Sequence, residues 1–309
     1  MTANRLAVVV VSYRTPELTA SAAQSGLDSG AEAVVIIDNA SGDDTLHRLR
    51  PDGRLSVLEN ARNQGFGEAA NLAARSVNAQ HLIFLNSDAT LTAEATSAML
   101  TELDRLGERA IVGPRLVGID GEIQRSAGLL PAPLDLAMRA LGLHAIGRKL
   151  AGVRCVGAVM RRSRIMTEYS SAQTAHEPID TTMVSGACFA ISQSAFHELD
   201  GFDERFFMYF EDADLCRRAA TAGMAIRYVP AAVISHVGGA SSSEDYHFGP
   251  LHARSMRQYL GKWYGPAGSA LALILLWLRA AALTIALQPQ AGRSRRAFWA
   301  ALWDRDPRR

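Results

Sequence analysis

The stretch LAVVVVSY, residues 6–13, is the clearest guide to the fold. It is a continuous apolar run, rich in valine, that two polar residues close. A strand with one face in water alternates apolar and polar residues, whereas a strand covered on both faces stays apolar throughout. The run therefore predicts a central strand of a sheet that helices cover on both sides.

Helical and strand-like segments alternate after this run. Thr15 and Pro16 predict the N-cap and first turn of a helix that continues to about Ser25. Further elements follow in alternation: strands at 32–41, 55–60 and 81–89, and helices at 42–50 and 65–77. This order predicts an α/β fold with a mostly parallel sheet.

Polar side chains close each of these strands. They are Ser12 and Tyr13, Asp38 and Asn39, Glu59 and Asn60, and Asn86, Ser87 and Asp88. Ligands of parallel α/β sheets bind outside the carboxyl ends of the strands. We therefore expect a binding site along this edge of the sheet.

The common glycine-rich phosphate loops are missing from the sequence. No G-x-x-x-x-G-K-[ST] occurs, and the first strand–helix turn, SYRTPE, has no glycine. A phosphate bound here needs another source of positive charge, and a divalent cation held by acids is the candidate. Asn86 and Asp88, two residues apart, would share one face of a strand and could hold Mg²⁺ or Mn²⁺. The same pattern also occurs in ordinary turns.

Composition limits the partners of the chain. The 309 residues are 48% hydrophobic and 20% charged with a net charge of +1, which fits a globular protein and disfavours nucleic acid as a partner. Cys155, Cys188 and Cys216 are few and far apart, so neither a disulfide framework nor a zinc site is indicated. The N-terminal apolar run is too short for a signal peptide, and we expect a cytoplasmic protein.

The C-terminal region is unusually apolar and then basic. Residues 268–287 carry one charge, Arg279, and residues 288–309 hold six arginines and two aspartates. The apolar length could span a bilayer, but a central arginine costs about 2.5–3.5 kcal/mol on insertion. We therefore favour a helix lying in the membrane interface, anchored by tryptophans and the arginine cluster. A helix packed on the domain core is the alternative.

The segment FFMYFEDADLCRR, residues 206–218, places three acids beside bulky apolar residues. A helix from about Glu211 to Ala222 would put these acids in its first turn, where the helix dipole stabilises negative charge. The neighbouring aromatic residues oppose this by desolvation, which raises a carboxyl pKa. The acids either serve catalysis or only favour a helix N-terminus. Asp214 is expected to pair with Arg217 or Arg218 one turn on.

Six segments in the same order resemble the glycosyltransferases of family 2, which have the GT-A fold. They are VVVVSYRTPE, IIDNASGDDT, NQGFGEAAN, LNSDA, VSGACFAISQSAFHELDGFDERFFMYFEDADLCRRAATAG and SHVGGAS, over roughly residues 6–240. The chain is especially similar to the rhamnosyltransferase-like members, which build bacterial cell-wall and surface polysaccharides. The resemblance implies a Rossmann-like nucleotide-sugar half over 1–115, a mixed acceptor half over 116–250 and C-terminal helices over 251–309.

The resemblance also implies roles for single residues. The nucleotide-sugar site would comprise Ser12, Tyr13, Asp38, Asn63, Gly65, Asn86, Asp88 and Gly186. Asp38 would hydrogen-bond the base or ribose. Asp88 stands where the DxD motif of the family places its metal-binding acid, with Asn86 in place of the first acid. His236 would be a second metal ligand, with an ordinary hydrogen-bonded loop histidine as the alternative.

The acidic segment matches the catalytic region of the family. Asp212 would be the base that takes the proton of an acceptor hydroxyl, and Glu211 would help to place the acceptor. A metal ion, Mg²⁺ or Mn²⁺, would offset the charge of the leaving nucleoside diphosphate. Met183 and Gln193 depart from the family pattern near the sugar, which leaves the donor open.

We therefore expect an inverting, metal-dependent glycosyltransferase at the inner face of the plasma membrane. The leading donor is dTDP-rhamnose, and the acceptor is a polyprenyl-diphosphate-linked sugar or a growing glycan. One alternative is a sugar-nucleotide pyrophosphorylase, which the glycine-free first turn disfavours. Another is a non-catalytic sugar-binding or scaffold protein, which would need none of these acids.

Overall fold

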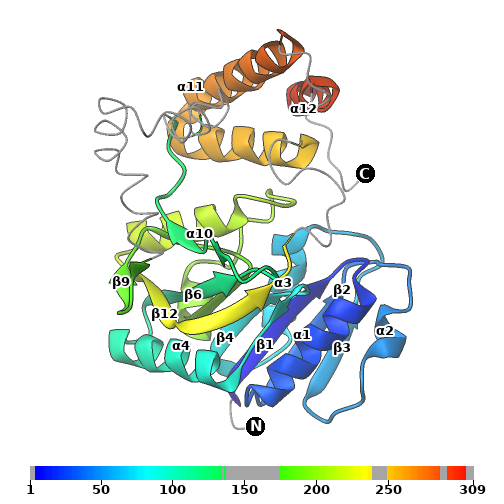
Figure 1. Ribbon diagram of the computed structural model, residues 1–309, viewed down its shortest axis with the longest axis vertical. Helices are drawn as coiled ribbons and strands as arrows, with labels where there is room; N and C mark the ends of the chain where they lie inside the picture. The colour runs from blue at the N-terminus through cyan, green and yellow to red at the C-terminus, as the bar shows by residue number, and fades with distance from the viewer. Residues whose placement is uncertain (1–3, 134–135, 137–173, 239–248, 286–290, 304–309) are drawn as a thin grey trace.

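The computed structural model describes residues 4–133, 136, 174–238, 249–285 and 291–303 (Figure 1). Its strands are β1 (Asn4–Ser12), β2 (Ala33–Asp38), β3 (Leu55–Glu59), β4 (Ala79–Asn86), β5 (Ala89–Thr90), β6 (Ala110–Val117), β7 (Ile123–Gln124), β8 (Ala127–Gly128), β9 (Ile179–Asp180), β10 (Met183–Val184), β11 (Cys188–Ser192) and β12 (Ala225–His236). Its helices are α1 (Pro16–Asp28), α2 (Thr45–Arg48), α3 (Phe66–Arg75), α4 (Ala93–Leu106), α9 (Gln193–Glu198), α10 (Glu211–Thr221), α11 (Pro250–Ile285) and α12 (Ala291–Trp303).

One sheet of ten strands connects the two predicted halves. Its order is β3-β2-β1-β4-β11-β6-β12-β5, with β7 beside β6 and β9 beside β12. The strands β3, β2, β1 and β4 run parallel, as their alternation with helices predicts. Beyond β4, β11 runs antiparallel to both of its neighbours, and β12 is parallel to β6. The predicted fold class, a mostly parallel sheet that becomes mixed in the second half, is confirmed.

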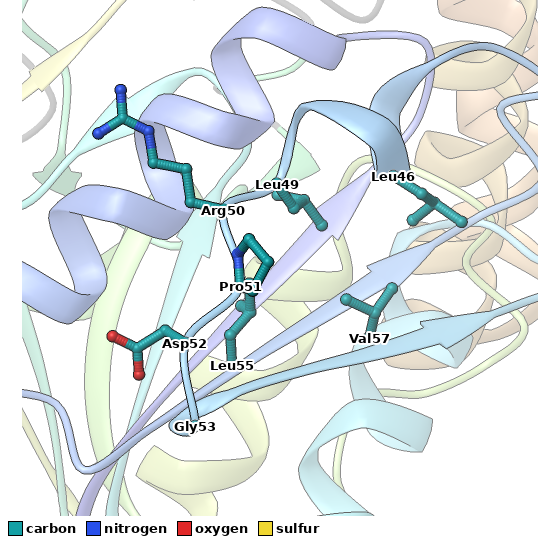
Figure 2. A pocket seen from close by; sticks show the side chains of 8 residues that line it. All are labelled: Leu46, Leu49, Arg50, Pro51, Asp52, Gly53, Leu55 and Val57. Carbon is teal, nitrogen blue, oxygen red and sulfur yellow. The ribbon is translucent and has the colours of Figure 1, made fainter.

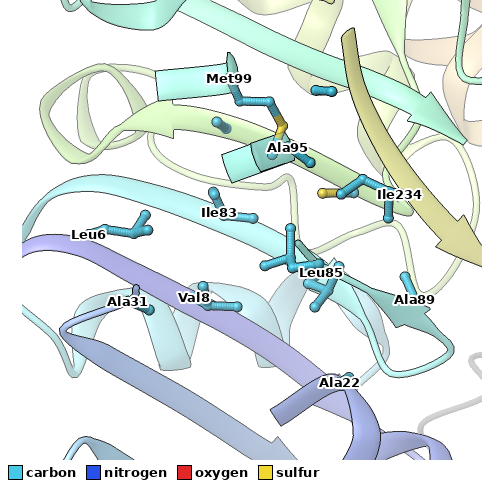
Figure 3. Packing of buried hydrophobic residues seen from close by; sticks show 14 of the residues in the cluster. Leu6, Val8, Ala22, Ala31, Ile83, Leu85, Ala89, Ala95, Met99 and Ile234 are labelled. Atoms are coloured by element: carbon cyan, nitrogen blue, oxygen red, sulfur yellow. The ribbon is translucent and has the colours of Figure 1, made fainter. Parts of the chain in front are cut away.

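The strand β1 lies in the middle of the parallel part, as predicted for residues 6–13. Its side chains alternate between two apolar layers. Val8 belongs to a cluster with Ala22 of α1 and Met99 of α4 (Figure 3). Val9 belongs to a second cluster, which includes the alanines of α3. Because both faces are buried, every position in the strand interior is apolar.

Two elements differ from the sequence prediction. The strand predicted over 81–89 ends at Asn86, because Ser87 and Asp88 turn the chain toward the short strand β5. The helix expected over 42–50 is reduced to the four residues of α2. The helix α11 begins at Pro250, next to the expected start of the C-terminal helices at 251. The sequence also predicts a proline-opened loop and then an amphipathic helix within 128–152, and a polar loop over 161–178; these lie largely outside the described residues.

The helices α11 and α12 lie on the far side of α10 from the sheet (Figure 1). α11 is interrupted at Gly265, which has a φ of 66° and a ψ of −161° and precedes Pro266. Its buried side packs on Phe210 and Ala213 at the start of α10. Among the described residues, the segment Pro250–Ala281 is long and apolar enough to cross a membrane, but a single such helix is weak support because buried core helices pass the same test.

Candidate functional site

The carboxyl ends of the parallel strands gather polar side chains, as predicted. Thr15 donates a hydrogen bond from its hydroxyl to Ser87 Oγ over 2.9 Å. This contact joins the end of β1 to the turn after β4. Thr15 stands at the N-cap position of α1, but its side chain makes no cap hydrogen bond, contrary to the expectation from sequence. Its hydroxyl fixes the strand ends to each other instead.

Ser12 and Tyr13 differ in their access to a ligand. Ser12 is fully buried, with its hydroxyl 2.8 Å from Thr19 Oγ1 and its carbonyl oxygen accepting from the Asn39 N–H over 2.9 Å. Its polar groups therefore contact α1 and β2 in this structure, and the nucleotide contact expected of it stays a prediction. Tyr13 is half-buried, and the Arg14 guanidinium lies 5.0 Å from the centre of its ring.

Asp38 closes β2 as predicted and is largely buried. One carboxylate oxygen accepts from the Ser41 N–H over 3.1 Å, and the other accepts from the Ser41 hydroxyl. Ser41 Oγ in turn accepts from the Arg14 N–H over 2.9 Å. These bonds tie the ends of β1 and β2 together and fix the Asp38 carboxylate at the rim of the sheet.

Asn39 organises the loop that carries the predicted residues Asn63 and Gly65. Its Nδ2 donates to Asn63 Oδ1 over 2.9 Å and to the Gly65 carbonyl oxygen over 3.1 Å. Its Oδ1 accepts from the Gln64 N–H over 3.0 Å. Sequence reasoning noted Asn39 as one polar residue among several at the strand ends but assigned it no role. In the structure its amide holds the loop against β2.

The loop before α10 packs against the loop that carries Gly65. The Phe66 N–H donates to the Phe207 carbonyl oxygen over 2.8 Å. A Cβ atom on Gly65 would lie 2.3 Å from that oxygen, and Gly65 has a φ of 85°, so only glycine fits there. Tyr209 and Phe210 also have positive φ, 70° and 68°, which is strained for aromatic residues. This strained turn places the start of α10 at the rim of the sheet.

Asp88 and His236 meet across the edge of the sheet. His236 ends β12 and pairs with β5, directly after the turn that holds Asp88. His236 Nε2 lies 3.3 Å from Asp88 Oδ1, and Asp88 Oδ2 accepts from the Gly238 N–H over 3.1 Å. Both side chains are largely buried. Asn86 and Asp88 do not share a strand face as expected, because the strand ends at Asn86 and Asp88 lies in the turn.

Gln124 of β7 contacts the opposite side of the His236 ring. Its Oε1 lies 2.6 Å from His236 Nδ1, and its Nε2 donates to the His236 carbonyl oxygen over 2.9 Å. Sequence reasoning missed Gln124, because it lies in a short hairpin that carries no motif. Only the pairing of β7 with β6 brings it to the site.

The donor atoms of Asp88 and His236 fit a divalent cation. Mn²⁺ accepts both carboxylate oxygen and imidazole nitrogen, and Mg²⁺ prefers oxygen ligands and phosphates. Among the described residues there is no group of three or more His, Cys, Asp or Glu side chains that could hold a metal ion by themselves. A cation here would complete its coordination with oxygen atoms of a bound phosphate and with water.

Asp212 lies in the first turn of α10, beside Gly186 at the mouth of β11. Its Oδ2 accepts from the Gly186 N–H over 2.9 Å, and its Oδ1 accepts from the Ala213 N–H over 2.7 Å. A Cβ atom on Gly186 would lie 3.2 Å from Asp212 Cβ, so glycine permits this close approach. Burial raises the pKa of Asp212, and the two backbone N–H groups oppose that rise.

Glu211 is more buried than Asp212, with 8% of its surface exposed. Its Oε2 has no hydrogen-bond partner within the described part of the chain. Burial, and then the neighbouring Asp212 charge, raise the pKa of Glu211 to about 8. At neutral pH, Glu211 therefore keeps its proton and can donate a hydrogen bond. Neighbouring carboxyl groups with different protonation are common where one acts as a base.

Asp214 is fully buried and pairs with Arg218, one of its two expected partners, over 2.8 Å. Its other carboxylate oxygen accepts from Lys262 Nζ over 2.6 Å and from Trp263 Nε1 over 2.9 Å. Lys262 also contacts Asp203 Oδ2 over 2.7 Å. This network joins α10 to α11. The two partners from α11 were not expected, because they lie about fifty residues away in sequence.

Backbone contacts connect the two acidic centres. The Asn86 N–H donates to the Ala187 carbonyl oxygen over 2.9 Å. Ala187 follows Gly186, whose N–H binds Asp212, and Asp88 comes two residues after Asn86. The neighbouring ends of β4 and β11 therefore place Asp88, with His236 beside it, on the same rim as Gly186, which binds the Asp212 carboxylate from α10.

A pocket of about 490 Å³ lies away from this rim, where α2 meets the turn that enters β3 (Figure 2). Its lining residues are Leu46, Leu49, Arg50, Pro51, Asp52, Gly53, Leu55 and Val57. None of them is a predicted site residue, and the turn at 49–53 precedes β3 instead of following it. The pocket is not part of the candidate site.

Two family models match the chain. One, described as glycosyl transferase family 2, covers residues 8–200, and the other, glycosyl transferase family group 2, covers residues 143–303. A similar curated protein is the N-acetylglucosaminyl-diphospho-decaprenol L-rhamnosyltransferase of Mycobacterium tuberculosis. It is 28% identical over an alignment of 227 residues, and the match covers 69% of this chain and 69% of that protein.

Two solved structures resemble the fold. GalNAc-T7 with UDP, GalNAc and Mn²⁺ has a TM-score of 0.56 at 16% identity; the match covers 82% of this chain, which spans only about half, 48%, of that protein. The mannosyltransferase PcManGT of Pyrobaculum calidifontis, in complex with GDP-Man and Mn²⁺, has a TM-score of 0.53 at 16% identity and covers 99% of this chain and 89% of its own. Likeness at this identity bears on the fold alone.

Proposed function

Since the chain belongs to glycosyl transferase family 2, we propose that it is an inverting transferase that needs a divalent cation and a nucleoside-diphosphate sugar. The chain is a glycosyltransferase of the GT-A fold and resembles the rhamnosyltransferases. We propose L-rhamnose from dTDP-rhamnose as the transferred sugar, because the mycobacterial relative is named as an L-rhamnosyltransferase. Its name also supports a sugar on a polyprenyl diphosphate as acceptor, with a growing glycan as the other candidate.

One observation carries the proposal: Asp212, in the first turn of α10, binds Gly186 at the start of β11, and the adjoining end of β4 leads to the Asp88–His236 pair. A transfer with inversion needs a base on the acceptor side and positive charge on the leaving-group side. Asp212 would be the base, and Asp88 and His236 would hold the cation that supplies the positive charge. Neither a scaffold nor a pyrophosphorylase requires this pairing.

The proposed reaction is a single displacement. The acceptor hydroxyl oxygen forms a bond to the anomeric carbon while the bond from that carbon to the diphosphate oxygen breaks. Asp212 takes the hydroxyl proton, and the nucleoside diphosphate leaves with the bonding electrons. Attack from the face opposite the leaving group inverts the anomeric carbon. The two backbone N–H groups hold the Asp212 carboxylate in place for this step.

Glu211 would position the acceptor. It is buried beside Asp212 and carries a proton at neutral pH, so it can donate a hydrogen bond to an acceptor oxygen without adding a second negative charge. On the donor side, Asp38, Asn63 and Gly65 would line the nucleotide. Asp88 and His236 would hold Mg²⁺ or Mn²⁺, which supplies positive charge to the leaving diphosphate.

We propose that residues 1–115 bind the nucleotide sugar, residues 116–250 bind the acceptor and residues 251–309 contact the membrane. The first boundary falls inside β6, so the two halves share one sheet. Membrane contact fits a lipid-linked acceptor, because the hydroxyl to be glycosylated then lies at the bilayer surface. It would place the protein at the cytoplasmic face of the membrane as a peripheral protein.

Calorimetric titration tests the metal-dependent donor site. Wild type and Asp88→Ala are titrated with dTDP and with UDP, each with and without Mn²⁺. We expect dTDP to bind wild type at least about tenfold more tightly with Mn²⁺, and this gain to be lost in Asp88→Ala, because a first ligand has been removed. Asp28→Ala, which alters an exposed acid at the distal end of α1, serves as the control and should match wild type.

The outcomes separate the parts of the proposal. A clear preference for UDP would replace dTDP-rhamnose as the donor. Folded wild-type protein that binds neither nucleotide with Mn²⁺ would contradict the metal-dependent transferase itself.

A further inference from the structure

The Gln124 side chain has only one orientation that satisfies both of its contacts. The His236 carbonyl oxygen can only accept a hydrogen bond, so the amide nitrogen of Gln124 must face it, over 2.9 Å. The amide oxygen then faces His236 Nδ1 over 2.6 Å. The His236 carbonyl oxygen therefore binds the amide nitrogen of Gln124, and His236 Nδ1 binds the amide oxygen. A flipped amide would place its oxygen against the carbonyl oxygen, so that orientation is excluded.

This orientation requires a proton on Nδ1 of the His236 ring. An amide oxygen only accepts hydrogen bonds, so Nδ1 must carry the proton that bonds to it. In the neutral imidazole, Nε2 then has the free lone pair. Nε2 is the nitrogen that lies 3.3 Å from Asp88 Oδ1. Two electron-pair donors at that separation repel each other unless a cation or a proton lies between them.

We propose that Gln124 is a positioning residue that fixes the tautomer and ring direction of His236, so that Nε2 is presented with Asp88 to a divalent cation. The inference rests on the proposed metal-dependent function and extends it to a residue outside any motif. A histidine ligand that donates its other N–H to a fixed acceptor is a better and better-oriented ligand. A neutral amide does this without adding a charge near the diphosphate.

The hairpin that carries Gln124 has a tight turn, which lies close to the Gln124 amide. Gly118 and Gly121 form its turn, in which the Gly118 N–H donates to the Glu122 carbonyl oxygen over 2.9 Å. A Cβ atom on Gly118 would lie 2.5 Å from Asp120 Oδ1 and 3.1 Å from Gln124 Nε2. A larger residue there would therefore crowd the Asp120 carboxylate first and the Gln124 amide second. The contact depends on the tight turn as well as on the glutamine.

The test compares two variants of the same hairpin. Gln124→Met keeps the length of the side chain and removes both hydrogen-bonding groups. Glu122→Met introduces the same residue two positions earlier, at an exposed site. For each full-length protein, electron paramagnetic resonance measures the Mn²⁺ dissociation constant in the presence of dTDP. Long-range ¹H–¹⁵N spectra of the metal-free protein at pH 8 report which His236 nitrogen is protonated.

We expect Gln124→Met to bind Mn²⁺ about 10- to 100-fold more weakly, as is usual when a ligand loses its supporting hydrogen bond. The His236 signals should change from a single Nδ1–H tautomer to a mixture, while dTDP without metal binds as in wild type. Glu122→Met should match wild type in all three measurements. A fold defect alone would not change the tautomer of a protein that still binds dTDP.

Two results would overturn the inference alone: wild-type His236 protonated on Nε2, or Gln124→Met binding Mn²⁺ within about twofold of wild type. Wild type that binds no Mn²⁺ with dTDP would contradict the proposed function and this inference together.

Discussion

Glu211 and Asp212 are adjacent in the chain but have different surroundings. Asp212 accepts two backbone hydrogen bonds, which favour its charged form, whereas Glu211 Oε2 is buried with no partner in the described structure. Burial raises the pKa of both acids, and more backbone hydrogen bonds oppose the rise at Asp212 than at Glu211. A pair of this kind can combine a charged base with a neutral donor at the same pH.

The raised pKa of Glu211 predicts a pH-dependent stability. The unfolded chain loses this proton near the ordinary pKa of 4.5, and the folded chain keeps it to about pH 8. Between these values the folded state binds the extra proton, so the free energy of unfolding falls as pH rises. Glu211→Gln cannot lose a proton, so urea titrations at pH 5, 6.5 and 8 should show a smaller fall than in wild type.

Glu94→Gln is the matched control, because Glu94 also lies in the first turn of a helix but is exposed. It should keep the slope of wild type. If Glu211→Gln keeps that slope too, then Glu211 is charged in the folded protein at neutral pH, and its role as a hydrogen-bond donor is wrong.

At the scale of elements, α10 depends on α11 as well as on the sheet. Asp214, in the first turn of α10, binds Arg218 on its own helix and Lys262 and Trp263 on α11. The acid is completely buried, so its charge relies on these partners. The helix that carries Asp212 is thus held from both sides.

Asp214→Asn should lower the free energy of unfolding by about 3 kcal/mol, because it leaves buried cationic partners without their anion. The loss is at the lower end for a buried pair, since Lys262 keeps Asp203. Chemical denaturation measures it. Asp44→Asn breaks an i,i+4 pair with Arg48 at the surface and should change little, because solvent screens exposed pairs. Equal effects of the two variants would contradict the account of α10.

The elements that local patterns specify could be predicted from sequence. The apolar run of β1, and the acids and Gly223 that bound α10, gave the right element type, with α10 ending at Thr221 and not Ala222. The end of β4 could not be predicted, because Ser87 and Asp88 leave the strand through a turn that depends on β5 pairing with β12. The same sequence letters would fit a longer strand.

The site residues that lie within family motifs could be predicted from sequence, and those outside the motifs could not. Asp212 and Asp88 were named from sequence, and the fold brings them to one rim. Gln124 and Asn39 act through contacts made across strands, which depend on register and leave no signal in the local sequence. Sequence could not show that the Ser12 hydroxyl lies 2.8 Å from Thr19 Oγ1 of α1.

At the scale of the molecule, α11 and α12 form an apolar and basic surface away from the sheet. Trp277 of α11 and Trp303 of α12 are 56% and 70% exposed, and Arg295 and Arg296 are exposed on α12. Exposed tryptophans near arginines suit the interface of an anionic bilayer. One side of α11 packs on Phe210 and Ala213, as the alternative of a core helix expects, and contact of the other side with a membrane stays a proposal.

Replacing Trp299 and Trp303 together with alanine should weaken binding to vesicles of phosphatidylglycerol and phosphatidylcholine by about tenfold or more, because two aromatic anchors leave the interface. Co-sedimentation measures it, and high salt should weaken the wild-type binding as well. Ile119→Ala removes an exposed apolar residue on the β6–β7 turn and should have no effect. Wild type that fails to bind these vesicles would contradict the membrane proposal.

The most direct test of the central claim is transfer of labelled rhamnose from dTDP-rhamnose to a polyprenyl-diphosphate-linked N-acetylglucosamine, measured with wild type and Asp212→Asn. We predict metal-dependent transfer with inversion by wild type and a loss of about 10²- to 10⁴-fold in Asp212→Asn, with donor binding unchanged, because only the base has been removed. Transfer by Asp212→Asn at the wild-type rate would contradict the assignment of Asp212 as the base on which this account depends.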